Sequence, residues 1–202
     1  MAKSAIGSAF GFISTITTRI ISGVKSRQAE DAVLGLSEDT IKQLTDEFVQ
    51  KLITSVTGVA ENCYRVVVDY GQTLQQMIAN GRYDCANSDI NADNFPISGN
   101  GKENVVIELV HFGQDMGSEA VLKEFEARGL RAATLPKLLA FGVTYPEKQR
   151  EFPIVALGSV WQSRSGCRYV PYLRRRSDER RLSLCWVGGR WFGSCRFAVV
   201  RK

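Results

Sequence analysis

The final part of the chain alternates between apolar and polar side chains, and this pattern limits the possible fold more strongly than any other feature. It occurs in three short runs: residues 170–173, 182–186 and 197–200. Trp186 lies in one of these runs, and Trp191 lies between two of them. Because successive side chains of a strand point to opposite faces, a period of two decides which residues can reach a core. The sequence therefore predicts paired strands here, with one face packed and the other exposed.

Composition separates this segment from the rest of the chain. Residues 163–195 contain eight Arg and no Lys, Gln or Met, whereas residues 1–162 contain eight Lys and seven Arg. Residues 163–202 carry 11 basic and 2 acidic side chains, a net charge of +9, and residues 1–162 carry 15 and 19, a net charge of −4. The positive field of the final segment could attract nucleic acid, an anionic membrane or an acidic protein surface.

Upstream of this segment, strand and helix patterns follow one another. Strands are predicted at residues 64–70, 105–112 and 152–161, and helices at residues 74–79, between Ser118 and Gly129, and between Thr134 and Tyr145. Ser118 supplies a capping hydroxyl for the second helix. Residues 152–161 are almost continuously apolar, which is typical of a fully buried central strand. This order predicts an α+β domain.

The first sixty residues predict an N-terminal helical extension, residues 1–60, ahead of a domain at residues 61–202. Apolar residues at helical spacing form a stripe between Ile41 and Val56, and Ser37 supplies its cap. These helices could dock on the following domain, pair with a copy of the chain or contact a partner. Polar residues interrupt residues 1–27, which disfavours a signal peptide or a membrane span. A cytoplasmic location is favoured, with a cell or virion surface as the alternative.

The sequence offers little for catalysis or metal binding. Its five cysteines include no CxxC pair, so they indicate neither a zinc site nor a complete set of disulfides. His111 is the single histidine, and no nucleophile or metal ligand stands at a useful spacing from it. The last forty residues contain only Asp178 and Glu179 as carboxylates, too few for a calcium site. We expect no metal, no cofactor and no enzymatic activity.

Several separate pieces of the sequence match one known family. They are residues 129–139, residues 145–146 and 150–161, the Leu-x-Leu-x-Trp spacing of Leu182, Leu184 and Trp186 with Trp191 beyond it, and residues 195–202. In this order they resemble the variable proteins of diversity-generating retroelements, over about residues 62–202. The resemblance implies a C-type-lectin-like fold with mixed, mainly antiparallel strands and two or more helices, related to formylglycine-generating-enzyme domains.

The resemblance also implies a genetic origin for the unusual composition. In this family a reverse transcriptase copies a template into the 3′ end of the gene while randomising adenines. An AAC codon can then become any codon ending in C, and no such codon encodes Lys, Glu, Gln, Met or Trp. The absence of Lys, Gln and Met from residues 163–195 fits this expectation. Glu179 is the single Glu of that segment, and its two tryptophans occupy positions that we assign to the fixed core.

Alternation and resemblance together divide a variable segment at about residues 162–196 into two groups. Residues expected to face inward as structural support are Trp161, Leu182, Leu184, Trp186, Trp191 and Phe197. Residues expected on the variable, ligand-contacting face are Ser163, Arg164, Cys167, Tyr169, Tyr172, Arg174, Arg176, Arg181, Ser183, Cys185, Val187, Arg190, Phe192, Ser194 and Cys195. Tyr, Arg and Ser suit a binding face, because they supply rigid aromatic anchors, forked donors and small adaptable groups.

Three functions follow as hypotheses. The first is a non-enzymatic display protein whose variable face binds a macromolecular ligand, most simply a protein. The second is an Arg-driven binder of nucleic acid or of an anionic surface. The third is an oxidase like the formylglycine-generating relatives, with Cys185 and Cys195 as its cysteine pair, although a shared fold does not carry a shared function.

Overall fold

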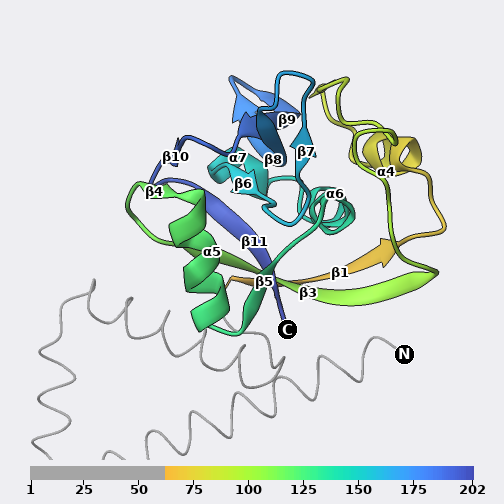
Figure 1. The fold of residues 1–202 in the computed structure, drawn as a ribbon. Coiled ribbons are helices and arrows are strands. Elements are labelled where there is room, and N and C mark those ends of the chain that lie inside the picture. The colour runs from red at the N-terminus through yellow and green to blue at the C-terminus, as the bar shows by residue number, and fades with distance from the viewer. Residues whose placement is uncertain (1–61) are drawn as a thin grey trace, which may run out of the picture. The chain divides into compact units, whose positions relative to one another are not determined.

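The computed structural model describes residues 62–202. The chain divides between Gly58 and Val59, next to the boundary predicted at residue 60. The predicted helical extension, residues 1–60, lies outside the described residues. Residues 62–202 form a mixed α+β domain built around one large sheet (Figure 1).

In the described part of the chain, the large sheet combines five strands of six to ten residues with four strands of two or three residues. The strands are β1 (Cys63–Asp69), β2 (Cys85–Ala86), β3 (Lys102–His111), β4 (Met116–Gly117), β5 (Leu130–Ala132), β6 (Ile154–Val155), β7 (Trp161–Gln162), β8 (Arg168–Arg176), β9 (Glu179–Trp186), β10 (Arg190–Trp191) and β11 (Arg196–Arg201). The helices are α4 (Leu74–Asn80), α5 (Ser118–Ala127), α6 (Leu135–Thr144) and α7 (Lys148–Glu151). The large sheet has the order β1-β3-β11-β6-β8-β9-β2, with β5 beside β11 and β7 beside β8. Only the β11–β6 and β2–β9 pairings are parallel, so the predicted mixed, mainly antiparallel sheet is confirmed.

Two apolar cores pack on opposite faces of the sheet, one with α6 and one with α5 (Figure 1). Strand β11 contributes side chains to both cores: Ala198 and Val200 pack in the first core, and Phe197 and Val199 pack in the second. Strand β8 does the same through Leu173 and Val170, both with no exposed surface. The predicted strands at 170–173, 182–186 and 197–200 are confirmed. Their second face, predicted to be exposed, is partly buried as well.

The predicted central strand over residues 152–161 is wrong in length. Only Ile154–Val155 pair as β6, although the position between β11 and β8 is central. The chain then turns at Gly158, whose N–H donates to the Ala133 carbonyl at 3.0 Å. A Cβ at Gly158 would lie 2.6 Å from the carbonyl oxygens of Ala132 and Ala133, so this turn requires glycine. Residues 154–157 are buried, but the run continues as a turn instead of a strand, and Val160 is exposed.

The predicted cap of α5 by Ser118 is also wrong. Gly117 occupies the N-cap position and makes no side-chain cap bond. The Ser118 hydroxyl instead donates to the Val187 carbonyl at 2.7 Å and accepts from Trp191 Nε1 at 2.8 Å. Ser118 therefore joins α5 to the segment that follows β9, a role that a local capping pattern cannot reveal.

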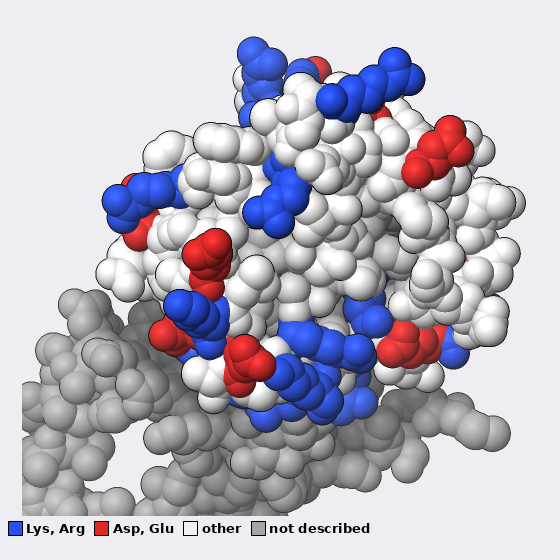
Figure 2. All heavy atoms as spheres, in the orientation of Figure 1, with Lys and Arg blue, Asp and Glu red and all other residues white. Residues whose placement is uncertain are grey.

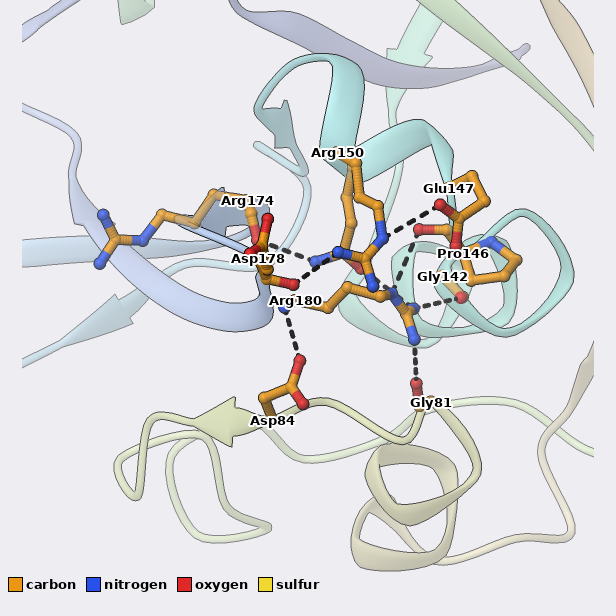
Figure 3. Close-up of polar contacts among 10 residues, drawn as sticks. Gly81, Asp84, Gly142, Pro146, Glu147, Arg150, Arg174, Asp178 and Arg180 are labelled. Atoms are coloured by element: carbon orange, nitrogen blue, oxygen red, sulfur yellow. Dashed lines mark hydrogen bonds and ion pairs between the residues drawn. The ribbon is translucent and has the colours of Figure 1, made fainter.

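Arg180 on β9 is buried, with 7% of its surface exposed, although it belongs to the Arg-rich segment. Its guanidinium donates to the carbonyls of Gly81 at 2.9 Å and Gly142 at 2.8 Å (Figure 3). It also donates to the Pro146 carbonyl and to the Gln149 side-chain amide oxygen, each at 3.1 Å. One side chain therefore satisfies four acceptors that come from distant parts of the sequence.

Two of these acceptors belong to helix ends. Gly81 is the C-cap of α4, and Gly142 lies in the last turn of α6. Carbonyls at a helix C-terminus lack intrahelical partners and carry the negative end of the helix dipole. The Asp84 carboxylate adds a bond from the Arg180 backbone N–H at 2.7 Å. Arg180 thus caps two helices at once, and their partial charges offset the cost of burying its own charge.

Tyr83 packs beneath this arginine. The Arg180 guanidinium carbon lies 5.2 Å from the centre of the Tyr83 ring. The Tyr83 hydroxyl is buried and meets no hydrogen-bond partner within residues 62–202. Burial raises the pKa of Tyr83 well above its ordinary value, because a phenolate there would lose its hydration. An unpaired buried hydroxyl is destabilising by about 1–3 kcal/mol.

We expect Arg180→Lys to lower the free energy of unfolding by about 3 kcal/mol, because one ammonium group cannot reach acceptors on both helices. Arg175→Lys is the matched control: Arg175 pairs with Arg180 across the hairpin but is exposed, so its loss should stay within about 0.5 kcal/mol. Urea unfolding of the full chain followed by tryptophan fluorescence measures both, since all three tryptophans lie within residues 62–202. Equal effects would contradict the role given to Arg180.

We expect Tyr83→Phe to raise the free energy of unfolding by about 1 kcal/mol near pH 7, because it removes the unpaired hydroxyl. Above pH 10.0 the unfolded wild-type chain loses the Tyr83 proton while the folded chain keeps it, so wild-type stability falls as pH rises. The variant lacks this contribution and should fall less steeply, by up to about 1.4 kcal/mol per pH unit. Urea unfolding across alkaline pH tests both effects. Tyr145→Phe, which loses a bond to the Arg65 carbonyl, should not gain stability.

Candidate ligand-binding face

The β8–β9 hairpin assigns the predicted contact residues to faces through its register. Tyr172 lies opposite Ser183 and Arg174 lies opposite Arg181, and paired residues of antiparallel strands share a face. We call this side the Tyr172 face; its strand members are Tyr172, Arg174, Arg176, Arg181, Ser183 and Cys185. The register agrees with the prediction that these six residues lie on one face. Val187, the first residue after β9, packs with Cys185 against the second core, and we include it in the face.

Tyr169 does not belong to that face. It is three positions from Tyr172, so its side chain points to the other side of β8, where it lies opposite Trp186. Its ring packs against Trp161 on β7, with ring centres 5.7 Å apart. The expectation that Tyr169 and Tyr172 contact the same ligand surface is therefore wrong.

One end of the Tyr172 face is covered by the second core. Cys185 and Val187 are half-buried against this core, and Tyr172 packs at its border. Cys195 lies inside the core with 7% of its surface exposed. The prediction of Cys195 as a contact residue is wrong, and Cys185 and Val187 are only partly accessible. The cause is the segment after β9, which folds back over this end and places Trp191 there.

The hairpin end of the face remains open. Arg174 lies over the Tyr172 ring, 5.7 Å from the ring centre, and its Nε donates to the Ser183 hydroxyl at 3.4 Å. Arg181 pairs with Glu179, and Arg176 is exposed. Burial raises the pKa of Tyr172, and the charge of Arg174 opposes this rise. Tyr172 therefore keeps its proton at neutral pH and offers a hydroxyl donor beside a guanidinium.

Two loops carry the other predicted contacts. The β7–β8 turn holds the exposed Arg164 between the half-buried Ser163 and Cys167, and the Ser163 N–H donates to the Cys167 carbonyl at 2.8 Å. The segment after β9 holds the remaining exposed contacts. They are Arg190, Phe192 and Ser194. The predicted alternation around an inward Trp191 is confirmed.

Five of the six predicted support residues are buried or half-buried, and one is exposed. Leu182, Trp191 and Phe197 are buried, and Trp161 and Leu184 are half-buried against the first core. Trp186 is 52% exposed, so its assignment as support is wrong. It shares the face of Leu182 and Leu184 but stands at the end of β9, where the core beneath no longer reaches. Its ring lies against Gly188, where a Cβ would come within 2.4 Å.

Sequence reasoning missed Arg180 as a structural residue. Composition alone cannot separate it from the seven other arginines of residues 163–195. The strand alternation could have identified it. Leu184 and Leu182 face inward, and the next inward position two residues earlier is Arg180. Its neighbour Arg181 was correctly assigned to the opposite face.

Cys185 lies close enough to Cys195 to influence the ionisation of the Cys195 thiol. Burial raises the pKa of both thiols, and Cys185 further raises the pKa of Cys195. Reactive cysteines need a lowered pKa, because the thiolate is the nucleophile. This environment therefore disfavours thiolate chemistry at neutral pH.

We expect Trp191→Ala to lower the free energy of unfolding by about 3–5 kcal/mol, because it empties a buried site and leaves Ser118 without its indole donor. Trp186→Ala should lower it by less than about 1 kcal/mol, since half of that side chain is already exposed. Urea unfolding followed by circular dichroism compares the two variants. A larger loss for Trp186→Ala would contradict the division between buried support and exposed surface.

Within residues 62–202, no three His, Cys, Asp or Glu side chains gather as a metal site would need. Helices long and apolar enough to cross a membrane are absent from the same range. In three comparisons, the chain matched no protein-family model, no curated protein and no solved structure.

Proposed function

We propose that residues 62–202 are a non-enzymatic ligand-binding module with a C-type-lectin-like fold, of the kind found in variable proteins of diversity-generating retroelements. The open part of its C-terminal segment binds a macromolecular ligand, and we take that ligand to be a protein. One observation carries the proposal. Every predicted contact residue except Cys195 keeps exposed surface, whereas Leu182, Trp191 and Phe197 are buried among them.

This division is what a variable face requires. Exposed substitutions usually change stability by less than about 0.5 kcal/mol, whereas truncation of a buried side chain costs about 2–5 kcal/mol. Arg176, Arg190 and Phe192 belong to the first class. Side chains at such positions can change while the buried residues preserve the fold.

The position of the face also suits display. In Figure 1 the β8–β9 hairpin lies at the top of the domain with β10 in the upper left part, and β11, which ends at Arg201, runs down to the C-terminus at the bottom. Strands β3, β11 and β6 separate β1 from the hairpin in the sheet order. A ligand on the hairpin would therefore meet neither β1 nor the C-terminal end of β11.

The two alternatives gain less support. On the face shown in Figure 2, the basic side chains along the top edge are interrupted by uncharged and acidic side chains and form no continuous basic groove of the kind that suits a nucleic-acid backbone. Two arginines of the segment are already engaged, since Arg180 is buried and Arg181 pairs with Glu179. The oxidase alternative conflicts with the raised pKa values of Cys185 and Cys195.

Sequencing the 3′ end of this gene from many isolates tests the proposal. We expect substitutions at the codons of exposed contacts such as Arg176 and Phe192, confined to codons ending in C, and a nearby template repeat with adenines at those sites. The sharpest control lies inside the segment: Arg180 should stay fixed while Arg176 and Arg181 vary, because only Arg180 is buried.

Two outcomes would overturn the proposal. Substitutions spread evenly over residues 62–202 would remove the variable face. Free variation of Arg180, at the same rate as Arg176, would show that diversity does not follow exposure. For the nucleic-acid alternative, binding to DNA should weaken steeply with salt, as counterion release requires.

A further inference from the structure

Phe192 is an aromatic side chain held in solvent by a fixed backbone. It is 73% exposed, a large fraction for a phenylalanine. It follows the buried Trp191, and Arg190 stands exposed on the other side of that tryptophan. Strand β10 ends at Trp191, and both sequence neighbours of this buried tryptophan, Arg190 and Phe192, are exposed.

The backbone before Phe192 is fixed through Trp191. The Trp191 indole N–H donates to the Ser118 hydroxyl at 2.8 Å, and that hydroxyl donates to the Val187 carbonyl at 2.7 Å. The Trp191 ring also packs edge-on against Phe197, with ring centres 5.9 Å apart. Strand β10 pairs with β4, which places Trp191 opposite Met116.

The backbone after Phe192 is fixed through Gly193. Its N–H donates to the Asp115 carboxylate at 2.8 Å. Its carbonyl accepts from His111 Nε2 at 2.7 Å, so Nε2 carries the hydrogen. A Cβ at this position would come within 2.9 Å of the Gln114 backbone nitrogen, so the two loops touch closely. Both backbone polar groups of Gly193 are therefore held, one by His111 at the end of β3 and the other by Asp115 in the loop between β3 and β4.

Arg190 is oriented by the same loop. Its guanidinium donates to the Asp115 carbonyl at 3.1 Å, and within the described residues this is the one acceptor it meets. A guanidinium has five N–H groups and binds carboxylates with two parallel bonds. Arg190 thus adds a held cationic donor beside the held ring of Phe192.

We infer that Arg190 and Phe192 form a preorganised anchor for a protein partner that offers an apolar pocket bordered by carboxylate groups. The inference rests on the proposed function, because it names the partner chemistry of the same face. Interface energy concentrates in a few aromatic and arginine residues that enter desolvated pockets. Fixing them beforehand reduces the entropy lost on binding. The clamps on Trp191 and Gly193 supply that fixation.

A membrane surface is the less suitable partner. Binding to a bilayer grows with the apolar area inserted, and it does not require a fixed side-chain position. The nearest exposed residues in the sequence, Arg190 and Ser194, are polar, so they add no apolar area for insertion beside the Phe192 ring. A shaped protein pocket makes use of both the rigidity and the adjacent charge.

The test selects phage-displayed, disulfide-constrained random peptides on the immobilised full chain and measures the Kd of the enriched peptides. We expect enriched sequences to place an aromatic or aliphatic residue beside Asp or Glu. Phe192→Ser should weaken their binding about 30-fold, the effect of a typical hot-spot residue. Val160→Ser removes another exposed apolar side chain on the β6–β7 turn and should leave Kd unchanged.

The hydrogen bond between Gly193 and Asp115 can be tested separately. Asp115→Ala should speed amide hydrogen exchange at Gly193 and weaken peptide binding about fivefold. Asp115→Asn keeps a side-chain oxygen as acceptor and should restore both values. A binding loss in Asp115→Ala without faster exchange at Gly193 would overturn the positioning role.

The remaining outcomes separate the two levels of the proposal. Peptides that depend on Arg174 but not on Phe192 would overturn the anchor and leave the proposed binding face standing. Peptides insensitive to Arg174→Ser and Phe192→Ser alike would overturn both. Failure to enrich any Phe192-dependent peptide overturns the anchor. The anchor for a protein partner is also overturned if the chain binds phosphatidylserine–phosphatidylcholine vesicles and Phe192→Ser abolishes this binding, because the partner surface would then be lipid.

Discussion

The buried guanidinium of Arg180 fixes the hairpin to the rest of the domain. Its acceptors lie at the C-terminal ends of α4 and α6, in the segment that leads to α7 and in α7 itself, so one side chain positions β9 against three helices. A carboxylate could have balanced the charge, but it would have supplied only one anchoring point. Helix-end carbonyls supply several, and each would be costly to leave unpaired. These bonds therefore also fix the position of the open end of the Tyr172 face.

A sheet with cores on both sides leaves a small exposed face. The second core takes Val170 from β8, which carries predicted contacts, and Phe197 from β11, and it covers Cys185 and Val187 in part. Variation at the covered end must therefore respect volume, whereas variation at the exposed Arg176 is free of this restriction. The face is graded, from constrained positions near Trp191 to unconstrained positions at the hairpin tip.

Alternation in the sequence correctly predicts the strands and the side to which each side chain points, because a period of two is a property of the backbone. It cannot predict what covers a face, and this explains the errors at Trp186 and Cys195. Trp186 points with Leu182 but extends past the core, whereas Cys195 follows a loop that folds inward. The prediction that Ser118 caps α5 was wrong for a related reason: its local sequence fits a cap, but its hydrogen-bond partners lie about seventy residues away. Burial depends on tertiary partners, which a single sequence does not list.

The clamp around Gly193 shows how a loop can change its side chains without changing its shape. Two of the groups that hold it, His111 and Asp115, lie outside residues 163–195, and they bind the backbone of Gly193 instead of a side chain. A backbone bond is indifferent to the identity of the neighbouring residues, so Phe192 could be replaced without loosening the loop. Only Gly193 itself is restricted, because the loop around Gln114 leaves no room for a Cβ. Specificity can therefore vary at such a position while the cost of ordering the loop is met in folding, before any ligand arrives.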